Sequence, residues 1–257
     1  MVVPRKIYAL WLQGVDTAPE IVKACLERWK NLNPEWDLVV LDREHALKAI
    51  GDFPIDLSKF YQPQAFSDIL RLKLLQDGGV WVDATAYPIV PLKDWIDNAS
   101  APSGFFAFMG HHASLDVSSW FLAAEDGNML CRKWWAETCR YWQQPRKLIT
   151  FKDNGGFRRN YEIDPMCVSP VAEKDTFPFF WVMYLFSYLR KTDADFDRLW
   201  EMTPKFSGLD AHAVQFSIED EGFRLEDTLT KGPVQKLTWK SDAFSERFLS
   251  LSRALQP

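Results

Sequence analysis

The sequence has few of the residues that cross-link a chain or hold a metal ion. It has four cysteines, Cys25, Cys131, Cys139 and Cys167, and no two of them have the C-x-x-C spacing. We therefore expect buried, reduced thiols and a reducing compartment rather than a disulfide framework. The four histidines show neither the H-x-x-x-H nor the H-E-x-x-H spacing, so the sequence predicts no zinc site of these kinds.

Long apolar runs are also missing. The most apolar stretch, Phe177–Leu189, is shorter than the ~20 residues that a membrane-spanning helix requires. Met1–Arg5 lead directly into a strand-like segment and do not resemble a signal peptide. We therefore expect a soluble, cytoplasmic protein with no transmembrane segment. Peripheral contact with a membrane surface through aromatic loops stays open.

An excess of positive charge is absent as well. The chain has 30 Lys and Arg against 35 Asp and Glu, which gives a net charge of −5. This balance argues against nucleic acid as a partner, although it allows a local basic pocket. Aromatic residues, by contrast, are abundant at 15%. We expect most of them in the core, and some at a site where flat rings stack on sugars or bases.

Apolar periodicity predicts alternating strands and helices, which is typical of an α/β domain. The expected strands are Lys6–Leu12, Trp36–Leu41, Val80–Asp83, Phe105–Met109 and Val117–Ala123. The expected helices are Asp16–Asn33, Asp42–Ile50, Gln64–Asp77, Asn128–Trp142, Phe179–Leu189 and Asp242–Leu255. The first strand, helix and strand predict a parallel βαβ unit with a right-handed crossover. Asp153–Arg159, rich in glycine and arginine, is the expected mobile loop.

Charged residues interrupt an otherwise apolar helix in the stretch Ser67–Thr85. The helix is apolar nearly all round, which predicts that it is buried. It nevertheless contains Asp68 and Arg71, whose i,i+3 spacing puts them on one face. Buried charges are costly unless they are paired or bound to something polar. The pair therefore either only fixes the helix or also holds a polar ligand.

Asp83 ends an apolar strand in the same stretch. In open α/β sheets, ligands bind in the crevice beyond the carboxyl ends of the strands. An acid at this position either opens a turn or holds a divalent cation or a ribose hydroxyl. Its proximity in sequence to Asp68, Arg71 and the Gly78-Gly79 turn favours a binding site.

These residues resemble the core signature of GT-A type nucleotide-sugar glycosyltransferases, which reads S-D-x-x-R, then G-G, then aromatic-x-D-x-D. The better match is the capsular polysaccharide synthesis protein family, in which the last element reads W-x-D-A-T, as Trp81–Thr85 does. Ile7–Gly14 resembles the I-x-x-x-W-x-Q-G strand of that family, and Lys236–Lys240 resembles its K-L-T-W-K segment. The resemblance implies a GT-A-like fold with a mostly parallel central sheet flanked by helices. It also implies one domain over 1–257, with a nucleotide-sugar-binding half (1–125) and an acceptor-side half with helical additions and a closing C-terminal segment (126–257).

The resemblance implies roles for particular residues. Asp68, Arg71 and Asp83 would be the catalytic residues: the first two hold hydroxyls of the donor sugar, and Asp83 contacts the ribose and a metal-bound diphosphate. The expected donor site consists of Trp11, Gln13, Gly14, Asp68, Arg71, Trp81, Asp83, Thr85, Lys236, Thr238, Trp239 and Lys240.

The sequence departs from the D-x-D pattern because Thr85 replaces the second acid. A threonine hydroxyl is a weaker ligand for a hard cation than a carboxylate. Two alternatives follow. Either Mn²⁺ or Mg²⁺ binds at Asp83 with help from the substrate phosphates, or the charge of the leaving group falls to cationic side chains: Lys236, Lys240, Arg158 or Arg159.

We therefore expect a glycosyltransferase that moves a sugar from a nucleotide-sugar, most simply a UDP-sugar, to a polysaccharide or glycan acceptor with retention of configuration. A nucleotide-sugar-binding protein without turnover is the alternative. A phosphotransferase ranks last, because a second acid at the strand end is lacking. The acceptor side is less specified. His111, His112, Asp116 and Trp181 are candidates there, although paired loop histidines are often merely solvated and a helical tryptophan often belongs to the core.

Overall fold

The computed structural model describes residues 2–60, 62–149, 164–168 and 175–254. Asp153–Arg159, including Arg158 and Arg159, lies outside the described residues.

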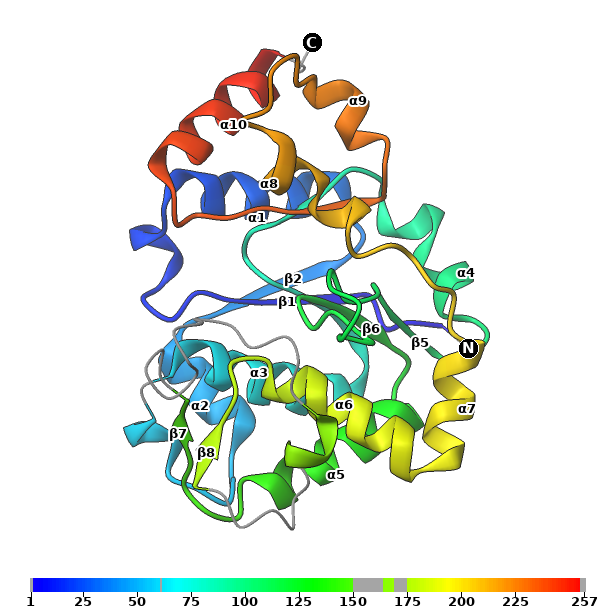
Figure 1. The fold of residues 1–257 in the computed structure, drawn as a ribbon. Helices are drawn as coiled ribbons and strands as arrows, with labels where there is room; N and C mark the ends of the chain where they lie inside the picture. Colours follow the sequence, from blue (N-terminus) through cyan, green and yellow to red (C-terminus); the bar gives the residue numbers. More distant parts are fainter. Residues whose placement is uncertain (1, 61, 150–163, 169–174, 255–257) are drawn as a thin grey trace.

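A five-stranded sheet runs through the centre of the molecule (Figure 1), in the order β2-β1-β3-β6-β5. Its strands are β1 (Lys6–Leu10), β2 (Asp37–Leu41), β3 (Gly79–Val82), β5 (Phe105–Ala107) and β6 (Phe121–Ala124). β1 pairs in parallel with β2 and β3, whereas β6 is antiparallel to both β3 and β5. All strands except β6 therefore point the same way. The expected α/β class with a mostly parallel sheet is confirmed.

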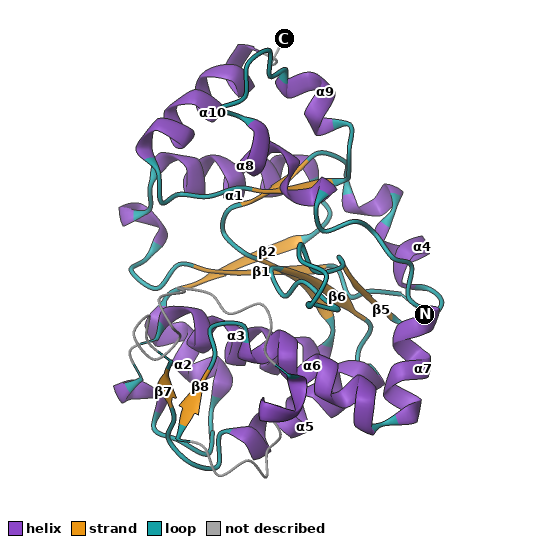
Figure 2. Cartoon of the chain, viewed as in Figure 1, coloured by secondary structure: helices purple, strands orange, loops and turns teal. Residues whose placement is uncertain are grey.

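Helices cover both faces of this sheet (Figure 2). They are α1 (Glu20–Leu32), α2 (Arg43–Ile50), α3 (Pro63–Leu74), α4 (Ile96–Ser100), α5 (Met129–Tyr141), α6 (Trp181–Thr192), α7 (Ala194–Met202), α8 (Ala213–Ser217), α9 (Leu225–Leu229) and α10 (Asp242–Ala254). None of the helices in the described part of the chain is long and apolar enough to span a membrane.

The sheet separates two hydrophobic cores because successive side chains of a strand point to opposite faces. In β3, Val80 and Val82 belong to the core that includes α1 and α10, whereas Trp81 belongs to the core that includes α3, α5 and α6. All four β3 residues are buried. A strand buried on both faces reads as continuous apolar sequence, which is why a strand was predictable here. It was expected at Val80–Asp83 and spans Gly79–Val82.

Two small sheets accompany the large one. β4 (Ala86–Pro88) pairs antiparallel with β9 (Val234–Lys236), and β7 (Lys147–Leu148) pairs in parallel with β8 (Thr176–Phe177). The sequence had predicted none of these four strands.

Several predicted boundaries were wrong. The strand expected at Val117–Ala123 begins at Phe121, because Ser118 and Trp120 make single backbone hydrogen bonds to Phe108 and Asp83 instead of continuing the ladder. The helix expected from Asp16 begins at Glu20, after a 3₁₀ turn at Val15–Thr17. The last turn of the helix expected to reach Asp77 is a 3₁₀ turn.

The described cysteines are free thiols. Cys25 and Cys131 are buried and Cys139 is half-buried. Burial raises the pKa of the Cys25 thiol to about 12, so this side chain is an inert part of the core.

Candidate active site

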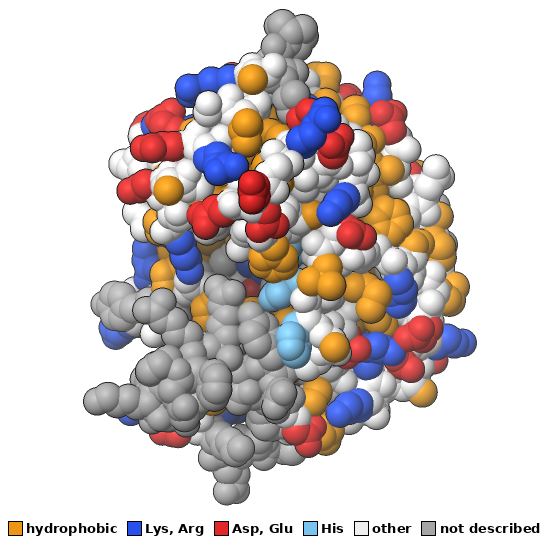
Figure 3. All heavy atoms as spheres, turned by 45° about the horizontal axis from the view of Figure 1, so that its top comes forward, with side chains coloured by type: hydrophobic (Ala, Val, Ile, Leu, Met, Phe, Trp, Pro, Cys, Tyr) orange, Lys and Arg blue, Asp and Glu red, His pale blue; other side chains and the backbone are white. Residues whose placement is uncertain are grey.

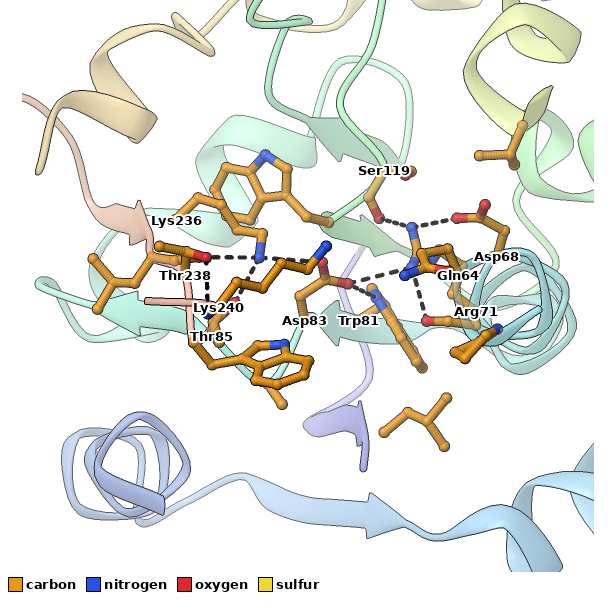
Figure 4. Close-up of a pocket in the computed structure, with 18 of the residues that line it drawn as sticks. Gln64, Asp68, Arg71, Trp81, Asp83, Thr85, Ser119, Lys236, Thr238 and Lys240 are labelled. Carbon is orange, nitrogen blue, oxygen red and sulfur yellow. Dashed lines mark hydrogen bonds and ion pairs between the residues drawn. The ribbon is translucent and has the colours of Figure 1, made fainter. Parts of the chain in front are cut away.

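A cavity of about 660 Å³ opens beyond the carboxyl ends of β1 and β3. Residues from eight parts of the chain line it: the segment after β1, helix α3, the end of β3 with the segment after it, the loop at His111, the loop around Ser119, the start of α6, the His212–Phe216 segment and the segment after β9. Figure 4 shows polar residues of α3, of the segments after β3 and β9 and of the Ser119 loop pointing toward one another. The cavity thus has the position that ligand sites take in open α/β sheets.

Helix α3 places Asp68 and Arg71 on the cavity wall. Pro63 stands at the first helical position, where its missing N–H costs nothing. Arg71 Nη1 lies 2.7 Å from Asp68 Oδ1 and donates to the Ser119 carbonyl at 2.8 Å. Its Nη2 donates to Ser67 Oγ at 2.8 Å and to Asp83 Oδ1 at 3.3 Å. The guanidinium therefore joins both acidic residues of the motif block although its side chain is only 5% exposed.

Asp83 lies directly after β3, in a tight turn closed by the hydrogen bond from the Ala86 N–H to the Asp83 carbonyl at 2.8 Å. Its Oδ1 also accepts from Trp81 Nε1 at 3.3 Å, and its Oδ2 lies 3.4 Å from Lys236 Nζ. Burial by itself would raise the pKa of Asp83, but the charges of Lys236 and Arg71 lower it below the usual value. Asp83 is therefore anionic at neutral pH, and its side chain is 28% exposed.

Asp68 has a different electrostatic environment. Burial raises the pKa of Asp68 to about 7, and the charge of Arg71 limits the rise. The two acids of the site consequently differ. Asp83 keeps its charge, whereas burial favours the protonated form of Asp68.

Lys236 reaches the cavity through the pairing of β9 with β4. Lys236 lies opposite Ala86 in this pairing, and the next residue continues it, because the Leu237 N–H donates to the Thr85 carbonyl at 2.9 Å. The Lys236 ammonium donates to Thr85 Oγ1 at 2.6 Å and to the Leu237 carbonyl at 3.3 Å. The residue in place of the second D-x-D acid is thus bound to a cation of the protein itself. Lys240 also extends toward Asp83 (Figure 4).

The donor atoms around Asp83 do not fit a divalent cation. Mg²⁺ is usually bound by one or two carboxylates together with substrate phosphates and waters, so the protein oxygens at such a site have to be available to it. Here one carboxylate and one hydroxyl are available, and both are bound to the Lys236 ammonium. Among the described residues, no group of three His, Cys, Asp or Glu side chains could hold a metal ion.

Aromatic rings form the rim of the cavity. Trp11 and Trp239, from opposite ends of the chain, meet edge to face with their ring centroids 5.5 Å apart. Trp239 is 44% exposed. Trp81 is fully buried below Arg71, whose guanidinium carbon lies 5.1 Å from the ring centroid. All three tryptophans line the cavity.

A comparison with known protein families identifies the family of this chain. The sequence profile of the family described as "Capsular polysaccharide synthesis protein" matches residues 2–151, more than half of the chain. The chain belongs to this family. The resemblance inferred from the motifs is therefore confirmed.

Two further comparisons add little to this assignment. The chain is similar to a solved structure named "PaToxG Glycosyltransferase", with a TM-score of 0.41 and 14% identity over 78% of this chain and 76% of that one. A search of curated proteins found no match.

Most of the expected donor residues of this family member line the cavity. They are Trp11, Gln13, Asp68, Arg71, Trp81, Asp83, Thr85, Lys236, Thr238, Trp239 and Lys240. Gly14 does not line it and follows the segment after β1, with φ of +83°. The roles assigned to these residues stay predictions.

Of the expected acceptor-side residues, His111 alone lines the cavity. His112 is exposed and lies 2.8 Å from Ser114 Oγ through its Nδ1. Asp116 is paired with Arg190 at 2.6 Å. Trp181 is fully buried and stacks on Tyr141 in the core.

His212 is a cavity residue that the sequence did not predict. Its Nδ1 lies 2.7 Å from the Gly208 carbonyl oxygen. Because a carbonyl only accepts, Nδ1 carries the proton and Nε2 is an unprotonated acceptor in the neutral ring. Burial lowers the pKa of His212 to about 4, so the ring is neutral at physiological pH.

Other residues surround His212 on this wall. Its ring centroid lies 4.9 Å from that of His111 and 5.4 Å from that of the half-exposed Phe216. Figure 3 shows histidine side chains beside exposed hydrophobic ones on one face of the molecule. No motif or periodicity marks His212 in the sequence. Ser119 lies within the strand expected at Val117–Ala123, but in the structure it precedes β6 and lies in irregular backbone.

Proposed function

We propose that this protein is a glycosyltransferase that uses a nucleotide-sugar donor and a polysaccharide or glycan acceptor. One observation carries the proposal: Arg71 holds Asp68 and Asp83 together on the wall of a cavity, and the Lys236 ammonium lies 3.4 Å from Asp83 in the same cavity. Membership of the capsular polysaccharide synthesis family supports it, since building a polysaccharide requires sugar transfer.

The charge distribution supports one orientation of the donor. Lys236 and Lys240 would contact the diphosphate, and Asp68 with Arg71 would hold hydroxyls of the sugar. Trp11 and Trp239 would contact the nucleoside, because flat bases stack on aromatic rings. A UDP-sugar is the donor we propose first, and the size of the cavity accommodates such a molecule.

In the proposed reaction, the bond between the anomeric carbon and the diphosphate oxygen breaks, and its electron pair stays with the diphosphate. The acceptor hydroxyl oxygen forms the new bond to the anomeric carbon, and its proton passes to a diphosphate oxygen. Positioning and stabilisation of the leaving charge supply most of the rate enhancement in such a site. We propose that the transfer retains the configuration at the anomeric carbon. NMR identifies the anomer of the product, and an inverted anomer would contradict this proposal.

Transfer or slow hydrolysis of the donor is the activity to measure. Purified protein is incubated with a panel of nucleotide-sugars, and release of the nucleoside diphosphate is followed. We expect one donor to be consumed, and Asp83→Asn and Arg71→Ala to lower its turnover by at least about 100-fold. Arg71→Ala keeps its fold in our expectation, because Asp68 becomes neutral by binding a proton once the guanidinium is gone.

Matched control variants distinguish an effect on the site from a general loss of stability. Asp195→Asn and Arg140→Ala change exposed residues of α7 and α5 and should leave turnover unchanged. Thermal unfolding of all four variants reports whether each is folded. Near wild-type turnover in folded Asp83→Asn, or binding of a nucleotide-sugar with no turnover of any donor or acceptor, would contradict the proposal.

A further inference from the structure

The Lys236 ammonium lies between the two side chains that would have to hold a metal ion. It is 2.6 Å from Thr85 Oγ1 and 3.4 Å from Asp83 Oδ2. Figure 4 shows these contacts as one connected set that continues through Asp83 to Arg71. The Lys236 ammonium therefore joins Asp83 and Thr85, the two residues at the acidic positions of the D-x-D element.

The backbone fixes this arrangement. Lys236 is the last residue of β9, and its partner Ala86 is adjacent to Thr85. The Leu237 carbonyl accepts a further hydrogen bond from the ammonium, and the Lys236 side chain is only 18% exposed. A lysine held by three oxygens on a buried strand is more restricted than a flexible surface lysine, so its charge is preorganised.

A divalent cation and this ammonium would compete for the same oxygens. Mg²⁺ binds its oxygen ligands at about 2.0–2.1 Å, so it would have to displace Lys236 from both Thr85 and Asp83. It would also bring two positive charges next to a third. Thr85 contributes no charge to offset them, whereas a second aspartate would have done so.

We propose that Lys236 takes the place of the divalent cation, so that this protein binds and activates its donor diphosphate without a metal. This inference rests on the proposed function. As the anomeric carbon–oxygen bond breaks, negative charge grows on the diphosphate. The Lys236 ammonium donates a hydrogen bond to it in place of its 3.3 Å contact with the Leu237 carbonyl, and keeps its own proton. Asp83 and Thr85 then hold the lysine in position rather than coordinating a metal.

The wild-type protein gives the first test. Binding of UDP, GDP, ADP and CDP is measured by titration calorimetry in excess EDTA and again with Mn²⁺. We expect the nucleoside diphosphate that binds to have a Kd that differs by less than about 3-fold between the two conditions. A Kd at least 10-fold weaker in EDTA would overturn the inference while leaving the proposed function intact.

Lys236→Gln gives the second test, because glutamine can still donate to Thr85 but carries no charge. We expect this variant to bind the matching nucleoside diphosphate at least about 10-fold more weakly, and to bind the nucleoside alone as wild type does. Turnover should fall by about 100-fold or more, as on removal of an oxyanion-stabilising donor. The control is Lys231→Gln, an exposed lysine five residues away, which should change neither.

The outcomes separate the two proposals. Unchanged diphosphate affinity in a folded Lys236→Gln variant, judged by its melting temperature, would overturn the role of Lys236. Failure of all four nucleoside diphosphates to bind in either condition would contradict the proposed function itself, and the inference would fall with it.

Discussion

Arg71 is the residue on which the site depends most. Asp68 and Asp83 are two acids within a largely buried wall, and each raises the cost of charging the other. The guanidinium contacts both, at 2.7 and 3.3 Å, and also donates to Ser67 and to the Ser119 carbonyl. A lysine could not make this set of contacts, because its ammonium lacks the planar fork of arginine. Arg71→Lys should therefore fail to restore the turnover lost in Arg71→Ala.

The neutral ring of His212 leads to a prediction of how the free energy of unfolding depends on pH. Its pKa is about 4 in the folded protein and 6.5 in the unfolded chain, so the unfolded chain binds more protons between these values. The group therefore costs no stability well above pH 6.5, and it lowers the stability as the pH falls from 6.5 toward 4. At pH 5 the loss is about 2 kcal/mol.

The measurement compares wild type with His212→Asn, whose amide can still donate to Gly208. Free energies of unfolding are obtained from urea titrations at pH 7.5 and pH 5. The difference between wild type and variant should shift by about 2 kcal/mol in favour of the variant at pH 5. A pH-independent difference would show that folding does not lower the pKa of His212.

The sequence predicted the acids and the arginine because they violate a local rule. Charged residues on an apolar helix and at the end of an apolar strand are costly, so their presence indicated a site. His212 and Ser119 violate no such rule. Ser119 contributes through its backbone carbonyl, which every residue possesses, and His212 acquires its role only through the packing around it.

At the scale of secondary structure, the turn between α3 and β3 positions the whole motif block. Gly78 has φ of 71° and ψ of 179°, a conformation that is nearly exclusive to glycine. A Cβ at this position would lie 2.6 Å from the Asp126 backbone nitrogen. Gly78 is thus required both by its own backbone and by a neighbouring chain segment.

Gly51 offers a matched comparison for this turn. Its backbone has a similar conformation, φ of 66° and ψ of −137°, but a Cβ there would contact nothing within 4 Å. We expect Gly51→Ala to lower the free energy of unfolding by about 1–3 kcal/mol from backbone strain alone. Gly78→Ala should lower it by clearly more, because steric overlap adds to the strain. Equal losses in chemical denaturation would show that the close approach to Asp126 has no energetic effect.

Elements that depend on local pattern were predictable, and elements that depend on distant partners were not. The helices α1, α2, α3, α5, α6 and α10 and the five strands of the large sheet all have a counterpart in the apolar periodicity. The β4–β9 pairing has none, because Ala86 and Lys236 are 150 positions apart and each strand has three residues. The sequence indicated this segment only through its resemblance to the K-L-T-W-K motif.

At the scale of the molecule, residues from both halves of the sequence line the cavity. The family profile matches residues 2–151, yet Lys236, Trp239 and Lys240 line the same cavity. The expected division into halves at residue 125 stays a prediction. Residues from both ranges form the site, so a fragment with residues 2–151 alone would lack the cations that we assign to the diphosphate.

The contact between Trp11 and Trp239 has an optical consequence. Two indoles 5.5 Å apart and inclined at 82° couple their electronic transitions, which produces a pair of circular-dichroism bands of opposite sign. Trp142 and Trp181, with centroids 5.3 Å apart at 87°, give a second contribution of this kind in the core. We therefore expect a nucleotide that enters between or beside Trp11 and Trp239 to change part of the bands, and Trp239→Phe to remove that part without unfolding the protein. An unchanged spectrum at saturating nucleotide would mean that the base binds away from this pair. The Trp11–Trp239 pair would thus report, without any added label, whether a nucleotide occupies the site.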